Sequence, residues 1–335
     1  MEQRTFGTTN LTSSVIGFGG WPMGKGQYGD VDDSEAIAAV HAAMDLGITL
    51  FDTAANYGWG HGEKVLGKAL KGRRDKVLLV SKGGMRWNPT RGSFDRDCSE
   101  KYLRLCLDES LERLQTDYVD IYLTHWPEAD RPSWAEEAMG TFVKLQSEGK
   151  IRYAGISNCN ADEMAACMKH FSIITNQVGY HLFDRRVEKQ VLPLAHQHQI
   201  GVMAYGSLAH GLLTGTMTPE TKFGDDDWRK AGYAFGLPLF SAGFFERNLR
   251  IVDRLKEFAQ NHNWSITQLA AGWVLSNPNV TVALTGAKNP AEITQNVLAS
   301  ECKLTNGHLE DIESILATET PMPDAPLGQN IGRKS

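Results

Sequence analysis

Four side chains capable of acid–base chemistry lie in or just beyond short apolar runs: Asp52 and Tyr57 in "FDTAANYG", Lys82 in "KVLLVSK" and His125 in "YVDIYLTH". A free phenol has a pKa of about 10, but a neighbouring ammonium favours the phenolate and lowers that pKa. Lys82 could supply the ammonium, and Asp52 could keep it charged. A histidine can donate a hydrogen bond to a carbonyl oxygen that gains negative charge. The set suits protonation of an alkoxide, which hydride reduction of a carbonyl produces.

Eight short apolar runs rich in β-branched residues predict eight strands. They cover residues 14–19, 48–52, 76–82, 118–125, 151–158, 173–177, 200–206 and 280–286. Segments with helical spacing of apolar residues, such as "SEKYLRLCLDESLERL", alternate with them. Continuously apolar strands are typical of parallel sheets, and eight alternating units favour a (β/α)8 TIM barrel, an α/β fold, over an open doubly wound sheet. Because no interdomain linker is evident, we expect residues 1–335 to form a single barrel domain.

Three segments depart from this repeat. Residues 4–12 predict a polar N-terminal β-hairpin around Gly7, and residues 207–248 predict a long, Gly-rich and aromatic loop after strand 7. Long excursions on a rigid scaffold are usually functional. The segment from about residue 321 to residue 335 is rich in Pro, Gly and polar residues and predicts a loose C-terminal tail that could fold over the barrel mouth.

The composition of the chain indicates which binding partners and which cellular compartment to expect. The net charge is -6 with acidic and basic residues mixed along the chain, so the sequence indicates neither a nucleic-acid partner nor a membrane surface. The N-terminus has no apolar stretch typical of a signal peptide, and we expect a cytoplasmic protein. The five cysteines form no C-x-x-C pair and the histidines form no H-E-x-x-H motif, so we expect no metal site and no disulfide framework.

Polar or aromatic groups stand at the predicted C-terminal ends of seven strands. In a parallel barrel these ends meet at one face, where the active sites of such barrels lie. For any single residue, an ordinary polar strand end remains the simpler explanation, but together the groups predict a lined site. They are Asp52, Lys82, His125, Ser157 with Asn158, Gln177, Tyr205 and the segment "TGAKNP".

Six segments resemble, in order and spacing, the signature segments of the aldo-keto reductase superfamily. They are "FDTAANYGWGHGEKVLGKAL", "LDESLERLQTDYVDIYLTHWPE", "GKIRYAGISN", "NQVGYHLFDRRVEKQVLP", "AYGSLAHGLLTG" and "TGAKNPAEITQN". The resemblance runs from about Arg4 to Asn296 and implies a (β/α)8 barrel that binds a nicotinamide cofactor in extended form, without a Rossmann domain. "GISN", "FDRR" and "GAKNP" look more like the bacterial and plant branches related to potassium-channel β-subunits.

The resemblance also implies roles for the four acid–base residues. Tyr57 matches the general acid, and Lys82 matches the residue that lowers the pKa of the tyrosine. Asp52 matches the acid that pairs with this lysine, although a purely structural role for it stays open. His125 matches the residue that orients the substrate carbonyl.

For the cofactor, the resemblance implies three groups of contacts. Ser157, Asn158 and Gln177 match the polar groups that bind the nicotinamide carboxamide. Tyr205 matches the aromatic residue that stacks on the nicotinamide ring. The third group, Ser207, Leu208 and Gly211, matches the family's loop that approaches the pyrophosphate. Small residues there let backbone N–H groups come close to the phosphates.

The segment that begins at Gly286, "GAKNPAEITQN", bears on the choice of cofactor. Lys288 stands where the family often has a cation against the 2'-phosphate, which favours NADP(H). Glu292 departs from the family pattern, because a carboxylate there would repel the phosphate unless it turned away or paired with Lys288. Gln295 and Asn296 match the pair that holds the adenine end. The resemblance therefore favours NADP(H), with NAD(H) possible.

Three tryptophans follow the first, third and fourth predicted strands: Trp21, Trp87 and Trp126. They could line the barrel mouth as a substrate pocket for a flat or apolar carbonyl compound, or each could be plain packing. Neither the identity of the substrate nor the oligomeric state follows from the sequence.

The reading that fits these residues is an NADPH-dependent reductase that converts an aldehyde or ketone to the alcohol, reversibly, with a small-molecule carbonyl or alcohol as its partner. An alternative is a nicotinamide-binding regulatory or redox-sensing subunit of the channel β-subunit type, with slow or no turnover. A barrel hydrolase that uses Asp52 and His125 would need a metal or a second carboxylate, and neither is evident.

Overall fold

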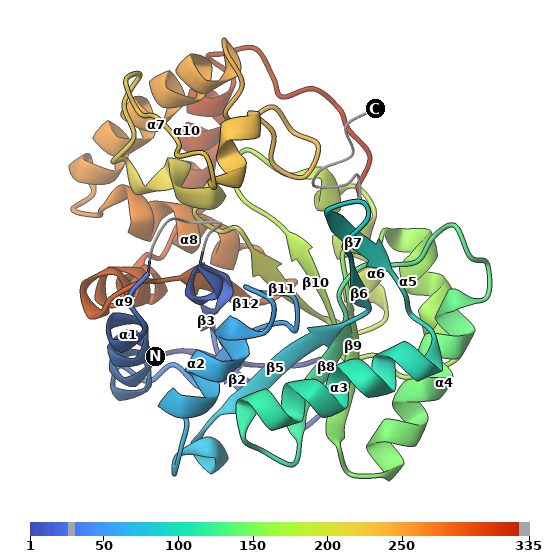
Figure 1. Ribbon diagram of the computed structural model, residues 1–335. Coiled ribbons are helices and arrows are strands. Elements are labelled where there is room, and N and C mark those ends of the chain that lie inside the picture. The colour runs from blue at the N-terminus through green and yellow to red at the C-terminus, as the bar shows by residue number, and fades with distance from the viewer. Residues whose placement is uncertain (26–30, 328–335) are drawn as a thin grey trace.

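The structure is a computed structural model that describes residues 1–25 and 31–327 (Figure 1). Eight parallel strands close into a barrel in the order β10-β11-β12-β3-β4-β5-β8-β9, which is the chain order around the ring. The strands are β3 (Ile16–Gly19), β4 (Leu50–Asp52), β5 (Leu78–Gly83), β8 (Val119–Thr124), β9 (Ile151–Ser157), β10 (Thr175–Gly179), β11 (Gly201–Tyr205) and β12 (Val280–Gly286). Each falls within or overlaps one predicted run, so the predicted (β/α)8 barrel is confirmed.

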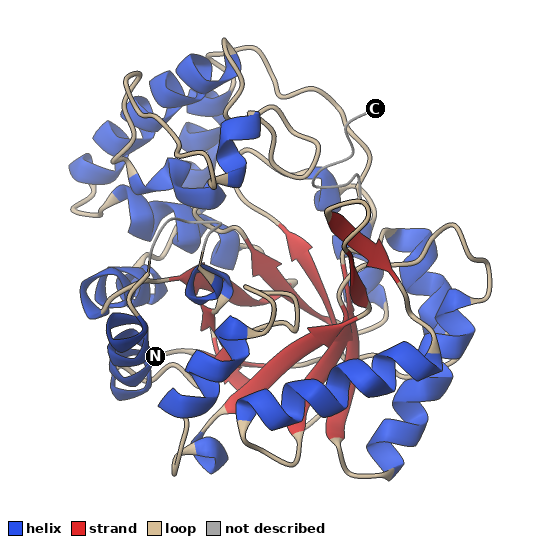
Figure 2. Ribbon diagram, in the orientation of Figure 1, coloured by secondary structure: helices blue, strands red, loops and turns tan. Residues whose placement is uncertain are grey.

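Helices surround the barrel strands (Figure 2). Local sequence explains several of their starts: Asp32 and Ser99, for example, accept hydrogen bonds from backbone N–H groups in the first turn of α1 and of α3. The helices are α1 (Asp33–Asp45), α2 (His61–Ala69), α3 (Glu100–Leu114), α4 (Trp134–Ser147), α5 (Ala161–Met168), α6 (Val191–Gln197), α7 (Phe244–Asn261), α8 (Ile266–Ser276), α9 (Pro290–Val297) and α10 (Asn306–Leu316). Short 3-10 helices are η1 (Trp21–Gly24), η2 (Arg74–Lys76), η3 (Arg186–Glu188), η4 (Ala209–Thr214), η5 (Trp228–Ala231) and η6 (Leu298–Glu301).

Two antiparallel hairpins stand outside the barrel. The predicted N-terminal hairpin is present as β1 (Gln3–Thr5) and β2 (Thr12–Ser14), and its connecting loop places Phe6 against the interior of the barrel. The second hairpin, β6 (Met85–Asn88) and β7 (Ser93–Arg96), was not predicted. Its strands are four residues each and half exposed. Apolar and polar residues alternate in "MRWN" but not in "SFDR", and so short a pattern is a weak signal for a strand.

The predicted long loop after strand 7 is present. Residues 206–243 contain no strand and no α-helix, and α7 begins at Phe244, four residues before the predicted end of the loop. Residues 321–327 of the predicted tail also lack regular structure, yet the Arg186 guanidinium donates hydrogen bonds to the carbonyls of Ala325 and Pro326. Residues 328–335 lie outside the described part of the chain.

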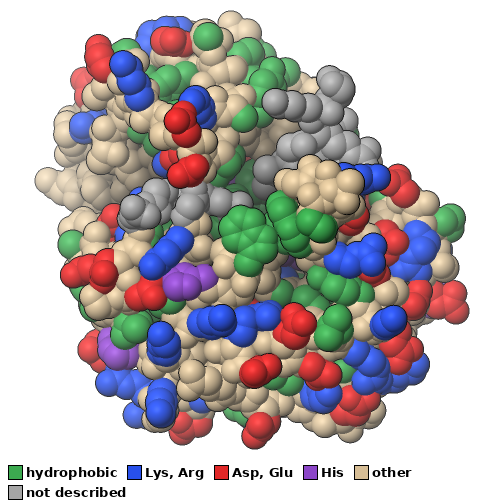
Figure 3. Space-filling model, viewed as in Figure 1, with side chains coloured by type: hydrophobic (Ala, Val, Ile, Leu, Met, Phe, Trp, Pro, Cys, Tyr) green, Lys and Arg blue, Asp and Glu red, His purple; other side chains and the backbone are tan. Residues whose placement is uncertain are grey.

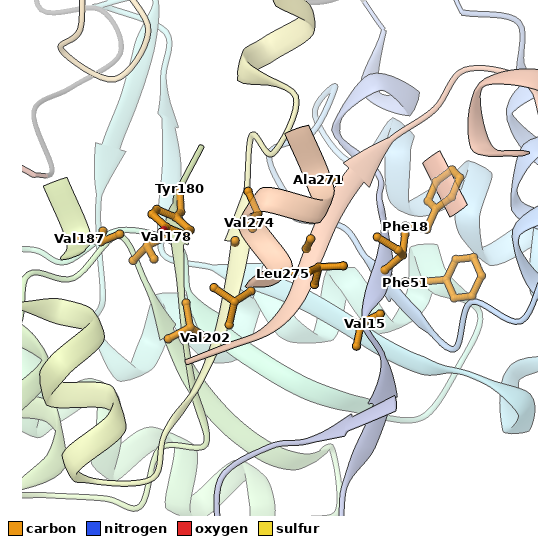
Figure 4. Close-up of a cluster of buried hydrophobic side chains, with 14 of the residues drawn as sticks. Val15, Phe18, Phe51, Val178, Tyr180, Val187, Val202, Ala271, Val274 and Leu275 are labelled. Carbon is orange, nitrogen blue, oxygen red and sulfur yellow. The ribbon is translucent and has the colours of Figure 1, made fainter. Parts of the chain in front are cut away.

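The buried apolar side chains form two clusters. The larger cluster lies between the strands and the helices, and Figure 4 shows Ala271, Val274 and Leu275 of α8 among apolar side chains near the strands. The smaller cluster fills the barrel interior with Phe6, Leu50, Val80, Ile121, Leu123, Ile174, Met203, Val282 and Leu284. Within the described residues, no helix is long and apolar enough to cross a membrane.

Candidate active site

A cavity of about 680 Å³ lies at the C-terminal ends of the barrel strands. Strand-end residues line its floor, and side chains of the 206–243 loop and of the β6–β7 hairpin line its walls. Figure 3 shows this face hollowed near its centre, with hydrophobic side chains gathered beside the hollow. This is the end of a parallel barrel at which catalytic residues are found.

Lys82 joins two other members of the predicted catalytic set. Its ammonium nitrogen Nζ lies 2.7 Å from Asp52 Oδ2, 2.9 Å from the carbonyl oxygen of Thr53 and 3.2 Å from the Tyr57 hydroxyl. The second carboxylate oxygen of Asp52 accepts a hydrogen bond of 2.8 Å from the amide of Gln177. The buried carboxylate and ammonium thus hold each other in place, and the tyrosine hydroxyl is within reach of the ammonium.

Strand register explains why these residues meet. Asp52, the last residue of β4, lies opposite Val80 of β5, whose side chain belongs to the barrel interior. Lys82 comes two residues later and therefore points to the same face as Val80. Tyr57 lies on the turn after β4, where Gly58 has a φ of +58°. A Cβ added to Gly58 would lie 1.7 Å from the carbonyl oxygen of Gly24, so only glycine permits this close approach of the turn to η1.

Burial dominates the electrostatics of this cluster. Loss of hydration raises the pKa of Asp52 and lowers that of Lys82, while their mutual attraction acts in the opposite direction on each. The pKa of Tyr57 lies well above its ordinary value, first because the phenol is buried and then because of the Asp52 charge. This direction is opposite to the one expected from the sequence, because burial and the Asp52 charge both disfavour the phenolate. Tyr57 is therefore protonated at neutral pH.

His125 completes the floor beside Tyr57. The two rings meet edge to face with their centroids 5.8 Å apart. Burial, together with the Lys82 charge, holds the pKa of His125 well below its usual value, so the imidazole is neutral at neutral pH. Among the described residues, its buried Nδ1 atom has no hydrogen-bond partner. A neutral imidazole can donate one hydrogen bond to a ligand oxygen.

The residues predicted for the nicotinamide carboxamide form one hydrogen-bonded network. Ser157 Oγ donates to the carbonyl oxygen of Gln177 over 2.8 Å, and Asn158 Nδ2 donates to the carbonyl oxygen of His125 over 2.9 Å. The Tyr205 hydroxyl donates to Asn158 Oδ1 over 2.7 Å. These hydrogen bonds hold the side chains of Ser157, Asn158 and Tyr205 in place at the ends of β9 and β11. The amide of Gln177, at β10, binds Asp52 instead. All four residues line the cavity.

The loop after β11 forms a cradle of the kind predicted for the pyrophosphate. Gly206, Ser207, Leu208 and Gly211 line the cavity, and both glycines have positive φ, +68° and +99°. A Cβ added at Gly206 would approach the ring of His210 to 3.1 Å, so a larger residue would crowd the loop. The bare backbone and the polar strand ends fit an extended dinucleotide.

At the far side of the cavity, Glu292 binds its own loop. Its Oε2 atom accepts a hydrogen bond of 2.8 Å from the backbone N–H of Lys288, and Asn289 caps the N-terminus of α9. Gly286, Lys288 and Glu292 line the cavity.

The remaining two residues predicted for the adenine end do not line the cavity. Asn296 is buried and donates to the carbonyl oxygen of Gly286, whereas Gln295 is exposed on α9. Their contact with a cofactor stays a prediction.

Aromatic residues form much of the cavity wall. The three predicted tryptophans, Trp21, Trp87 and Trp126, all line it. Trp21 stacks on Tyr57 with ring centroids 6.0 Å apart. Sequence reasoning missed four further lining aromatic residues: Trp59, Phe94, His210 and Phe235. The aromatic content of the long loop and of "YGWGHGE" was the only signal for three of them, and Phe94 lies in neither segment.

Within the described residues, no three His, Cys, Asp or Glu side chains are placed to hold a metal ion together. The floor of the cavity presents a phenol, an ammonium, a carboxylate and an imidazole. These groups suit proton transfer to a carbonyl oxygen.

Known proteins are similar to this chain over nearly its whole length. The family profile described as the aldo/keto reductase family matches residues 15–317. The aldo-keto reductase YhdN of Bacillus subtilis is 35% identical over 97% of each chain, and an NADH-specific methylglyoxal reductase of Escherichia coli is 31% identical over 95% of this chain and 98% of its own. A glycerol dehydrogenase of Gluconobacter oxydans has a similar structure, with a TM-score of 0.86 at 32% identity over 97% of this chain and 98% of that one. The family resemblance found in the sequence is thereby confirmed: this chain belongs to the aldo/keto reductase family of oxidoreductases.

Proposed function

We propose that this chain is an NADPH-dependent oxidoreductase that reduces an aldehyde or a ketone to the alcohol, and oxidises the alcohol in reverse. The observation that carries the proposal is the position of the Lys82 ammonium, 2.7 Å from the Asp52 carboxylate and 3.2 Å from the Tyr57 hydroxyl, at the floor of the cavity. Tyr57 and His125 line that cavity side by side.

When bound, the reduced nicotinamide supplies a hydride to the carbonyl carbon. Tyr57 donates its phenolic proton to the carbonyl oxygen, and the Lys82 ammonium stabilises the phenolate that remains. Asp52 keeps Lys82 charged and in position in a site where burial alone would favour the neutral amine. The neutral His125 donates a hydrogen bond to the same carbonyl oxygen and so orients the substrate.

The same network supports a proposal for how the cofactor binds. Asn158 and Ser157 would hold the carboxamide, and the ring of Tyr205 would support one face of the nicotinamide, which decides the face that delivers hydride. The backbone of Ser207 and Leu208 would bind the pyrophosphate. Because the amide nitrogen of Gln177 already binds Asp52, we infer that Gln177 connects cofactor binding to the carboxylate that positions Lys82.

Lys288 supports the preference for NADPH. Its side chain lies at the cavity edge, where an ammonium can contact a 2'-phosphate. Glu292 lies in the same wall, but its carboxylate is engaged by the backbone N–H of Lys288. A relative named as NADH-specific shows that this family also contains enzymes of the opposite preference, so both cofactors belong in the test.

The experiment is the initial rate of consumption of NADPH and of NADH, side by side, with a reactive aromatic aldehyde, accompanied by direct titration of both cofactors. Consumption of NADPH at a higher kcat/KM than NADH supports the proposal in full. Binding of both cofactors without turnover of any aldehyde or ketone would instead favour the regulatory, redox-sensing alternative. Binding of neither cofactor would contradict the cofactor assignment itself.

A further inference from the structure

A buried ion pair lies behind the floor of the cavity, between α2 and α3. Glu63, in the first turn of α2, is fully buried, and its Oε2 atom accepts a hydrogen bond of 2.7 Å from Nε of Arg113, in the last turn of α3. Neither residue lines the cavity. The proposed reaction gives this pair no part, yet the pair contacts the two segments that carry Lys82 and Tyr57.

The first contact is with the strand that carries Lys82. Ser81 Oγ donates a hydrogen bond of 2.7 Å to Glu63 Oε1, and both side chains are fully buried. Because side chains alternate along a strand, Ser81 faces the helices while Lys82 faces the barrel interior. Glu63 thus holds β5 at the residue directly before the lysine.

The second contact is with the turn that carries Tyr57. The backbone of Gly60 packs against Arg113, since a Cβ added to this glycine would lie 2.5 Å from Arg113 Cδ. The backbone N–H of Gly62 donates to the carbonyl oxygen of Tyr57 over 3.2 Å, which links the turn to the start of α2. Glu63 follows at the next position. The turn and the ion pair therefore form one packed unit.

The charge of Glu63 also favours the proposed reaction. Burial lowers the pKa of Lys82, whereas the charges of Asp52 and Glu63 both act to raise it. The carboxylate behind the strand thus helps to keep Lys82 in the ammonium form that stabilises a phenolate.

A second buried ion pair in the chain provides a comparison. Arg74 binds Asp120 over 2.7 Å, the same distance as in the Glu63–Arg113 pair. The two arginine side chains are 16% and 17% exposed, and the two carboxylates are almost completely buried. Asp120 lies near the start of β8, at the end of the barrel opposite the cavity. The two pairs thus share their chemistry and differ in their distance from the floor.

We propose that Glu63 and Arg113 are positioning residues, which hold the Tyr57 hydroxyl within reach of the Lys82 ammonium by clamping the turn after β4 to β5. This inference rests on the proposed function and adds two residues to it. Catalysis is sensitive to displacements of about 1 Å, so a clamp outside the cavity can govern kcat without touching substrate or cofactor.

The test compares Glu63→Gln with Asp120→Asn, since each substitution removes one buried charge and keeps a similar shape. Both should lower Tm, because each leaves an arginine without its partner. We expect kcat to fall about tenfold in Glu63→Gln, with KM for NADPH and for the aldehyde within about twofold of the native values. The control Asp120→Asn should keep kcat within about twofold. Equal losses of kcat in the two variants, or no loss in either, would overturn the proposal.

Two further variants separate positioning from folding. In a Tyr57→Phe background, Glu63→Gln should lower the residual kcat no further, because Glu63 acts through Tyr57. A tenfold loss that persists in this background contradicts the proposal. Ser81→Ala breaks the link to β5 but leaves the ion pair intact, and it should lower kcat about threefold with little change in Tm. If Glu63→Gln did not fold, a Ser81→Ala protein with the native kcat would overturn the clamp.

A crystal structure of Glu63→Gln tests the clamp without any turnover. If the native protein reduced no aldehyde or ketone, the proposed function would fail, and this structure would still decide the positioning. A Tyr57 hydroxyl displaced from the Lys82 ammonium supports the clamp, whereas a separation that stays at 3.2 Å contradicts it.

Discussion

The floor and the roof of this cavity are built in different ways. The floor, made of Asp52, Tyr57, Lys82 and His125, is held by short hydrogen bonds between groups on strands or directly after them. The roof, made of residues 206–243 and the β6–β7 hairpin, contains aromatic rings that contact one another. Strands are rigid and loops adapt, so the comparison suggests that the floor determines the reaction and the roof determines what is bound.

The roof depends on one guanidinium. Arg186 binds Asp184 through two hydrogen bonds of 2.8 and 2.7 Å and donates to the carbonyl oxygen of Phe235 over 3.1 Å. It also donates to the carbonyl oxygens of Ala325 and Pro326. A single, largely buried side chain thus ties the roof and the C-terminal segment to the loop after β10. Phe235 in turn stacks against His210 and lies tilted against Tyr205.

The largest expected effect concerns the floor. Lys82→Met should lower kcat by about 10²–10⁴-fold, because the tyrosine loses the cation that stabilises its phenolate. It should also lower the free energy of unfolding by about 3–5 kcal/mol, since the Asp52 carboxylate remains buried without its ion partner. Initial rates and chemical denaturation measure the two effects.

The double variant Asp52→Asn with Lys82→Met separates the effect on kcat from the effect on stability. It should recover most of the stability without recovering activity, because it removes the stranded charge but not the defect in chemistry. A Lys82→Met protein as active and as stable as the native one would contradict this account of the floor.

The next effect concerns the roof. Arg186→Gln frees the carbonyls of Phe235 and the C-terminal segment, and we expect KM for the cofactor to rise about tenfold while kcat changes less than about threefold. Arg185→Gln is the control, because Arg185 forms its ion pairs with Glu188 and Glu313 at the surface. A large fall in kcat with an unchanged cofactor KM would show that the roof takes part in the chemistry.

A smaller effect concerns the choice of cofactor. Glu292→Gln removes a negative charge but keeps an oxygen that can accept from the backbone N–H of Lys288. The ratio of kcat/KM for NADPH to that for NADH should rise about threefold, as expected for a partly exposed charge. Lys288→Met should lower the same ratio. If both variants left this ratio unchanged, Lys288 and Glu292 would not interact with the 2'-phosphate.

The smallest effect is an absence of pH dependence. Tyr57 must be protonated to act as the acid, and its pKa lies well above about 10, so it keeps its proton at neutral and moderately alkaline pH. The pKa of His125 lies well below about 6.5, so the imidazole stays neutral. The kcat for reduction should therefore be flat from about pH 6.5 to 9. A fall in kcat centred within that window would mean that the Tyr57 pKa is lowered instead.

The floor could be predicted from the sequence because strand ends in a parallel barrel converge on one face. Once Asp52 and Lys82 were assigned to neighbouring strands, their meeting followed from the register and the alternation of side chains. The closed barrel followed in the same way from eight alternating runs. Only the direction of the Tyr57 pKa shift was not foreseen, because it depends on the burial of the phenol.

The roof could not be predicted to the same degree. The β6–β7 hairpin has strands of only four residues, and apolar and polar residues alternate in just one of them, so its sequence is hard to distinguish from a polar loop. Phe235, His210 and Trp59 all have positive φ, which sequence patterns reveal reliably only at glycine. The positions of these rings depend on tertiary contacts between loops that lie far apart in the chain.

The measurement that tests the central claim most directly compares Tyr57→Phe with the native protein, using NADPH and one aromatic aldehyde, together with titration of NADPH into both proteins. If the floor performs the chemistry, kcat falls by about 10²–10⁴-fold while the dissociation constant for NADPH stays within about twofold. A Tyr57→Phe protein that keeps more than about a third of the native kcat would contradict the claim, because the proton would then have to come from another group.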